Sequence, residues 1–132
     1  MNAETILNAA IGVLKQRGRC VGDYETGDGR VDQLGALAIA GGETADIWRF
    51  WREFAVQELD GHALVLVEAA RALARQEAPL QPVDEMSVEQ LVTLLGDAND
   101  VLSDAGVFTF LARAAEAARA VSVRDYQTGD AA

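Results

Sequence analysis

Apolar residues recur along most of this chain at the three- and four-residue spacing of an amphipathic helix. The first stripe, over residues 3–17, begins after Asn2, which suits an N-cap, and ends before Gly18, which suits the end of a helix. Asp32, Ser87 and Asp104 are placed to cap later helices. The same spacing predicts helices over residues 33–40, 44–59, 63–76, 88–95 and 105–121. The pattern therefore predicts a mainly α fold, a compact bundle of five to six short helices.

The helical period is interrupted in residues 19–31, which hold the only cysteine, Cys20, and a cluster of glycines. Cys20-Val21-Gly22 and Arg30-Val31 flank residues 23–29, which contain Gly27-Asp28-Gly29, a sequence typical of a chain reversal. This pattern predicts a small β-hairpin near residues 19–31. Because two strands alone are marginally stable, we expect the hairpin to lean on the helices or on a third strand.

An internal repeat links this segment to the C-terminal region. VGDYETGD at residues 21–28 recurs as VRDYQTGD at residues 123–130, and both tyrosines of the chain, Tyr24 and Tyr126, lie in the two copies. The tail could extend the hairpin as a third strand, or the two copies could compete for one binding surface. Alternatively, both are polar turns with no common role. We expect a single helical domain, residues 1–121, followed by a C-terminal tail, residues 122–132.

The charges are unevenly distributed. The chain has 21 acidic and 11 basic residues, a net charge of −10, and no Lys or Arg lies between Arg75 and Arg113. This interval holds seven carboxylates, at Glu77, Asp84, Glu85, Glu89, Asp97, Asp100 and Asp104. Such a surface repels nucleic-acid backbones and attracts a cation or a basic protein surface. We therefore expect a protein partner with a basic surface and no direct binding of nucleic acid. The residues expected to bind it are Asp97, Asp100, Asp104, Glu89, Tyr24 and Tyr126.

Cys20, His62 and Asn99 are the candidates for a catalytic nucleophile, its base and an orienting residue. Cysteine nucleophiles favour helix N-termini, where the thiolate is stabilised. Here Cys20 follows the end of a predicted helix, and His62 lies near a predicted helix start. A buried structural cysteine and a partly exposed histidine are therefore the preferred interpretations.

Metal and phosphate sites are also weakly indicated. Asp97, Asp100 and Asp104 would align on a continuous helix and could hold a divalent cation, but they lack the glycine and alternating oxygen donors of a calcium-binding loop. Gly27-Asp28-Gly29 lacks the third glycine of a phosphate-binding loop, and the neighbouring carboxylates would repel phosphate. We interpret the aspartates as capping residues and a solvated face, and expect neither metal nor cofactor.

Four short motifs are spread over most of the chain: Arg19-Cys20-Val21-Gly22, Asp28-Gly29-Arg30-Val31, Leu34-Gly35-Ala36-Leu37 and Asn99-Asp100. They resemble a family of small uncharacterised proteins of actinobacteria and their phages, whose members show Trp-Cys-x-Gly, Gly-Arg-x-Cys, Leu-Gly-Ala-Leu and Trp-Asn-Asp. Arg19 and Ala98 stand where that family has Trp, and Asp32 or a neighbour stands where it has a second Cys. The missing Cys argues against a two-cysteine redox or metal role, and the resemblance implies no activity.

Three functional hypotheses follow. The first is a non-enzymatic, acidic regulatory or adaptor protein that binds a protein partner, one form of which is a phage inhibitor that imitates nucleic acid. The second is a small cysteine-dependent enzyme that uses Cys20 and His62. The third is a structural subunit of a homo-oligomer, in which the segment of Trp48 and Trp51 or the repeated tail meets its copy.

The expected location is the cytoplasm. The longest apolar runs, such as residues 63–67, are far shorter than the ~20 residues that a membrane-spanning helix needs. Residues 1–10 lack the basic start and long apolar centre of a signal peptide. A single cysteine agrees with a reducing compartment.

Overall fold

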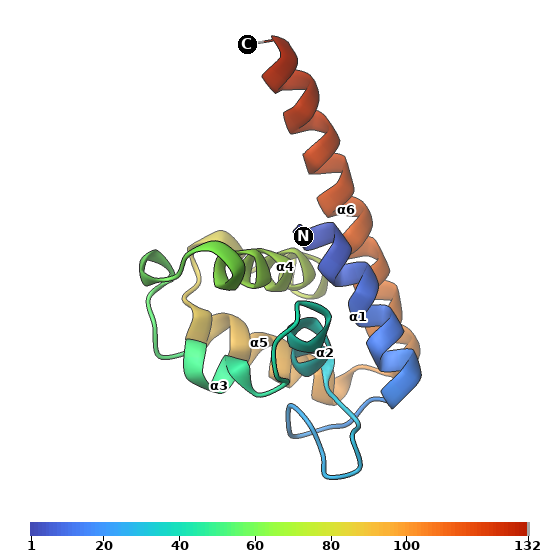
Figure 1. Ribbon diagram of the computed structural model, residues 1–132. Helices are drawn as coiled ribbons and strands as arrows, with labels where there is room; N and C mark the ends of the chain where they lie inside the picture. Colours follow the sequence, from blue (N-terminus) through green and yellow to red (C-terminus); the bar gives the residue numbers. More distant parts are fainter. Residues whose placement is uncertain (132) are drawn as a thin grey trace.

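The computed structural model describes the backbone of residues 1–131 and the side chains of residues 1–121, and it is mainly helical (Figure 1). The helices are α1 Ala3–Arg17, α2 Gln33–Ala40, α3 Ile47–Trp51, α4 Gly61–Glu77, α5 Val88–Val101 and α6 Asp104–Ala131. Two 3-10 turns lie between them, η1 Val56–Glu58 and η2 Val83–Glu85. The prediction of a mainly α fold is confirmed. Within the described residues, no helix combines the length and the apolarity needed to cross a membrane.

Helix α2 is the centre of the core. Its first six residues are buried, and it contacts α1, α3, α4 and α5. Trp48 of α3 is fully buried and donates from Nε1 to the Leu34 carbonyl oxygen at 2.7 Å, which ties α3 to α2. Helices α1 and α6 run side by side, and the C-terminal part of α6 projects past the body of the molecule (Figure 1).

The predicted hairpin at residues 19–31 is wrong, because the segment contains no strand. It contains two isolated bridges, in which Val31 pairs with Arg19 on one side and with Glu25 on the other. Gly22 and Gly29 adopt φ of 84° and 87°, so the chain turns away after each short pairing. The segment is therefore a folded loop, which we call the 19–31 loop, held by single hydrogen bonds such as Cys20 N to Val31 O at 2.9 Å.

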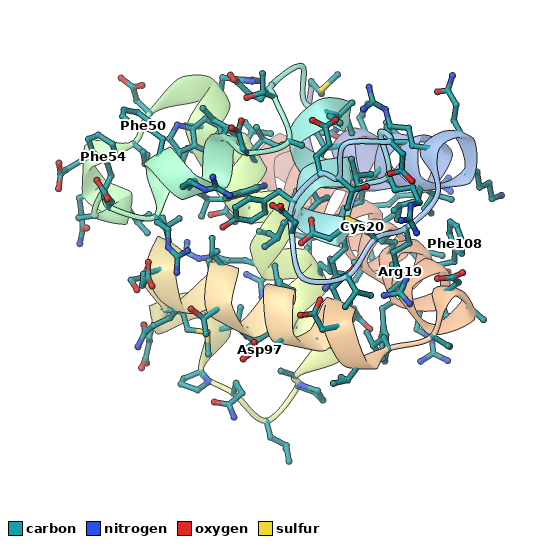
Figure 2. The ribbon with its side chains drawn as sticks, turned by 90° about the horizontal axis from the view of Figure 1, so that it is seen from below. Arg19, Cys20, Phe50, Phe54, Asp97 and Phe108 are labelled. Carbon is teal, nitrogen blue, oxygen red and sulfur yellow. The ribbon has the colours of Figure 1, made fainter. Side chains whose placement is uncertain are left out.

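The predicted helix over residues 44–59 is also wrong in length, because α3 ends at Trp51. The Ala55 N–H donates to Glu58 Oε1 at 3.2 Å, which favours the separate turn η1. Trp48 and Trp51 are buried with an edge-to-face geometry, whereas Phe50 is 59 % exposed. Figure 2 shows Phe50 and Phe54 together at one edge of the molecule, where their rings lie 5.0 Å apart.

The last two helices differ from their predicted bounds. Helix α5 passes through Gly96 to Val101. An interior glycine costs only ~1 kcal/mol, and the turn beyond it carries Asn99, whose side chain is hydrogen-bonded to Gln33 N and to the Cys20 carbonyl oxygen. Helix α6 is capped by Ser103, whose Oγ accepts from Gly106 N at 3.1 Å, and Asp104 lies in its first turn.

The predicted third strand at the C-terminus is wrong, because α6 continues through the tail to Ala131. The repeat has no shared backbone conformation. Gly22 has a φ of 84°, which an L side chain rarely adopts, and Arg124 occupies the matching position of the second copy.

Candidate functional site

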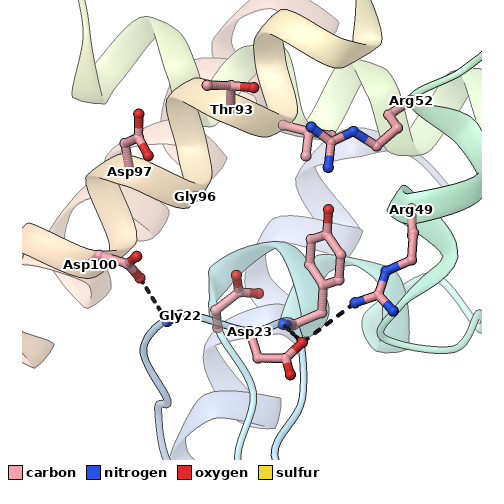
Figure 3. Close-up of a pocket in the computed structure, with 11 residues that line it drawn as sticks. Gly22, Asp23, Arg49, Arg52, Thr93, Gly96, Asp97 and Asp100 are labelled. Carbon is pink, nitrogen blue, oxygen red and sulfur yellow. Dashed lines mark hydrogen bonds and ion pairs between the residues drawn. The ribbon is translucent and has the colours of Figure 1, made fainter.

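A polar cleft of about 350 Å³ lies where the 19–31 loop, α3 and α5 meet (Figure 3). We call it the polar cleft, and its lining residues are Gly22, Asp23, Tyr24, Asp32, Arg49, Arg52, Val92, Thr93, Gly96, Asp97 and Asp100. Arg49 of α3 and Arg52, the residue that follows α3, form one wall, and Thr93, Asp97 and Asp100 of α5 form the opposite wall. The cleft thus separates cationic from anionic side chains.

Both arginines of the basic wall already have partners. Arg49 lies 3.6 Å from Asp23 Oδ1 and stacks its guanidinium 5.5 Å from the centre of the Tyr24 ring. Arg52 donates from Nε and Nη2 to Glu89 at 2.5 and 2.6 Å, and this bond holds the pKa of Arg52 above its ordinary value. Both arginines are therefore already paired with carboxylates that do not belong to the opposite wall.

The acidic wall carries two exposed aspartates. Asp100 accepts from the backbone N–H of Gly22 at 3.0 Å, which fixes the 19–31 loop against α5. Asp97 lies one helical turn away and has no hydrogen-bond or ion-pair partner among the residues whose side chains are described. Asp97 is thus available to an incoming cation.

Asp32, the N-cap residue of α2, also lines the cleft and is only 4 % exposed. Its Oδ1 accepts from Gly35 N at 2.7 Å and caps α2, as the sequence predicts. Burial, together with the nearby carboxylates of Asp100 and Asp23, raises the pKa of Asp32 to about 7, against the opposing effect of the hydrogen bond from Gly35 N. Negative charge is therefore in excess on this side of the cleft.

Asn99 joins the loop to the helices beside the cleft. It is fully buried, its Oδ1 accepts from Gln33 N at 3.1 Å, and its Nδ2 donates to the Cys20 carbonyl oxygen at 3.0 Å. These bonds satisfy buried backbone groups of α2 and of the loop. Asn99 thus holds the 19–31 loop and the start of α2 against α5.

The structure does not assemble the candidate catalytic set. The Cys20 thiol is buried and donates to the Asp23 carbonyl oxygen at 3.2 Å, and burial raises its pKa, as do Asp32 and Asp23. His62 lies at the start of α4, with Nε2 3.2 Å from Glu43 Oε1. The Asn99 side chain is hydrogen-bonded to the backbone carbonyl oxygen of Cys20 and not to its thiol. Cys20 therefore has the environment of a structural thiol rather than of a thiolate nucleophile.

The expectation of seven uncompensated carboxylates is wrong for three of them. Glu89 pairs with Arg52, Asp84 pairs with Arg75, and Asp104 pairs with Arg19. Those arginines come from outside the acidic interval or from its edge, so sequence distance concealed the pairing. Asp104 also lies on a different helix from Asp97 and Asp100.

Of the predicted partner-binding residues, Asp97, Asp100 and Tyr24 meet in the polar cleft, whereas Glu89 lies beside it on Arg52. Tyr126 lies outside the residues whose side chains are described. The basic wall was not predicted from the sequence. The signal for it was the spacing of Arg49 and Arg52 three residues apart, on one face of a helix.

Arg19 was also missed, although it organises the corner between α5 and α6. Its side chain is 13 % exposed and donates to the carbonyl oxygens of Asn99 and Leu102, and its Nε lies 2.6 Å from Asp104 Oδ1. Arg19 thus supplies hydrogen-bond donors to carbonyl groups at the end of α5 and an ion pair to the first residue of α6.

Among the described residues, no group of three or more His, Cys, Asp or Glu is arranged to hold a metal ion. No family model, no curated protein and no solved structure matches the chain.

Proposed function

We propose that this protein is a non-enzymatic regulatory or adaptor protein that accepts a lysine or arginine side chain of a protein partner in the polar cleft. The observation that carries the proposal is the acidic wall of α5. Asp97 and Asp100 line this wall, Asp32 also lines the cleft, and no basic residue lies on the α5 wall.

The charges of the cleft favour a cation. Arg49 is opposed by Asp23, and Arg52 is bonded to Glu89. The acidic wall therefore has no arginine of its own to balance it. A partner cation beside Asp97 and Asp100 would supply that charge. It would also weaken the repulsion from Asp100 that adds to the effect of burial on the pKa of Asp32.

The size of the cleft supports a single inserted side chain. Its volume of about 350 Å³ is at the small end of the range for ligand pockets. Tyr24, stacked under Arg49, offers an aromatic surface to the stem of a lysine or arginine side chain.

The internal ion pairs argue against imitation of nucleic acid, because three of the seven carboxylates of the acidic interval are matched by arginines. The proposal assigns the protein to the cytoplasm, where Cys20, its only cysteine, would stay reduced.

Chemical-shift mapping with an oligolysine peptide tests this function. We expect the amide signals of Gly22, Tyr24 and Gly96 to shift during the titration, because these residues line the cleft. The double variant Asp97→Asn, Asp100→Asn should lose the shifts, since asparagine keeps the acceptor for Gly22 N but removes the charge.

The double variant Glu85→Gln, Glu116→Gln is the matched control, since it also removes two exposed carboxylates, neither of which lines the cleft. It should leave the shifts unchanged. Shifts spread evenly over the acidic surface, or equal losses in the two variants, would contradict the proposal.

A further inference from the structure

The buried amide of Gln33 and the half-buried carboxyl group of Glu77 meet between α2, α4 and α5, outside the polar cleft. Gln33 of α2 is fully buried, and its Nε2 donates to Glu77 Oε1 of α4 and to the Leu95 carbonyl oxygen of α5, each at 2.8 Å. Gln33 thus links three helices from one side chain.

Each of the two groups has one oxygen without a donor. Gln33 Oε1 and Glu77 Oε2 are both buried and have no hydrogen-bond partner among the described residues. Reversing the Gln33 amide would not help, because Oε1 would then face the Leu95 carbonyl oxygen, which is also an acceptor. Unsatisfied buried acceptors are rare and costly, so this pair requires an explanation.

We propose that Glu77 binds a proton at neutral pH and donates from Oε2 to Gln33 Oε1, which closes a two-bond pair between a carboxylic acid and an amide. One proton satisfies both acceptors. Gln33 Nε2 donates to Glu77 Oε1, and Glu77 Oε2 donates in return. The pair fastens the last turn of α4 to the first turn of α2 without a buried charge.

The electrostatic surroundings agree with a neutral Glu77. Burial raises the pKa of Glu77 to about 7, opposed only by the Gln33 hydrogen bond, and no charged side chain contributes. The charged groups of the neighbouring elements are engaged elsewhere. Arg75 pairs with Asp84, Arg71 pairs with Glu68, and Asp32 caps α2, while Asp97 and Asp100 of α5 line the polar cleft.

The sign of the pH dependence follows from this shift. The folded protein binds the Glu77 proton more tightly than the unfolded chain, so its contribution to stability is complete at acidic pH and is lost as pH rises through about 7. Between about pH 5 and about pH 8, the folding equilibrium constant should decrease by a factor on the order of tens from this group.

The direct test follows the side-chain carboxyl carbons of the full chain labelled at glutamate, by carbon NMR across pH. We expect one signal to titrate near pH 7 and to be missing in Glu77→Gln. If no glutamate signal titrates near pH 7, the proposal is overturned.

A second measurement uses the same variant by urea unfolding. Glutamine at position 77 can make both bonds to Gln33 without a proton, so Glu77→Gln should match the wild type near pH 5 and be more stable near pH 8. Glu116→Gln, at an exposed position of α6, should keep the wild-type pH dependence. A Glu77→Gln variant with the wild-type pH dependence would overturn the proposal.

Discussion

Asp32 acts both as a helix cap and as part of the charge of the polar cleft. Its side chain bonds the first turn of α2, and its pKa of about 7 means that it is partly protonated near neutral pH. Since the folded state binds this proton more tightly than the unfolded chain, Asp32 stabilises the fold most at acidic pH and less as pH rises through about 7.

Asp32→Asn should therefore flatten part of the pH dependence of unfolding. Asparagine caps helices about as well as aspartate, so little stability is lost near pH 5, and stability is gained near pH 8. Urea denaturation at both pH values checks this. A loss of stability near pH 8 would show that the charged form of Asp32 is favoured in the fold.

Arg19 is the residue on which the α5–α6 corner depends. Arg19→Gln removes bonds to two backbone carbonyls and to Asp104, and we expect a loss of about 2 kcal/mol in the free energy of unfolding.

Arg30→Gln is the matched control, because Arg30 is 51 % exposed and pairs with exposed Asp28, an interaction worth less than about 1 kcal/mol. Equal losses in the two variants by urea denaturation would contradict the role assigned to Arg19.

At the scale of elements, the 19–31 loop is held in place by a close approach to α2. A Cβ atom at Gly35 would lie 2.3 Å from the Tyr24 carbonyl oxygen, which accepts from Asp32 N. Gly35→Ala must displace the loop, so we expect a loss of about 1–3 kcal/mol.

The contrasting change is Gly12→Ala in α1, where a Cβ atom meets nothing within 4 Å. Because alanine favours helix, this variant should gain about 0.5–1 kcal/mol. Thermal unfolding of both variants checks the pair. A stable Gly35→Ala variant with unchanged Tyr24 signals would contradict the close approach.

Local signals predicted some elements well. Helix α1 with its Asn2 cap, α2 with its Asp32 cap, and the capping box of Ser87 and Gln90 are confirmed. The 19–31 loop and α3 were mispredicted because their shapes depend on distant partners. Asp100 holds Gly22, and Glu89 holds Arg52.

At the scale of the whole molecule, the net charge of −10 conceals how the charges are arranged. The sequence identified Asp97, Asp100 and Tyr24, which the fold brings together in the polar cleft. It could not identify Glu77 as a buried acid, because burial and the meeting with Gln33 arise only from the packing of α2 against α4 and α5.

A test of the cleft must separate a specific site from general attraction to an acidic protein. Gly96 lies on the α5 wall of the cleft, and a Cβ atom there meets nothing within 4 Å. Gly96→Met would therefore fill the cleft without changing any charge. Gly12→Met makes the same change at an exposed position of α1 and serves as its control.

The most direct measurement is calorimetric titration of an oligolysine peptide into the wild type and these two variants. We expect Gly96→Met to bind at least about tenfold more weakly than the wild type, a loss of roughly 1.4 kcal/mol, and Gly12→Met to bind as the wild type does. Equal affinity for all three proteins would contradict the polar cleft as the binding site.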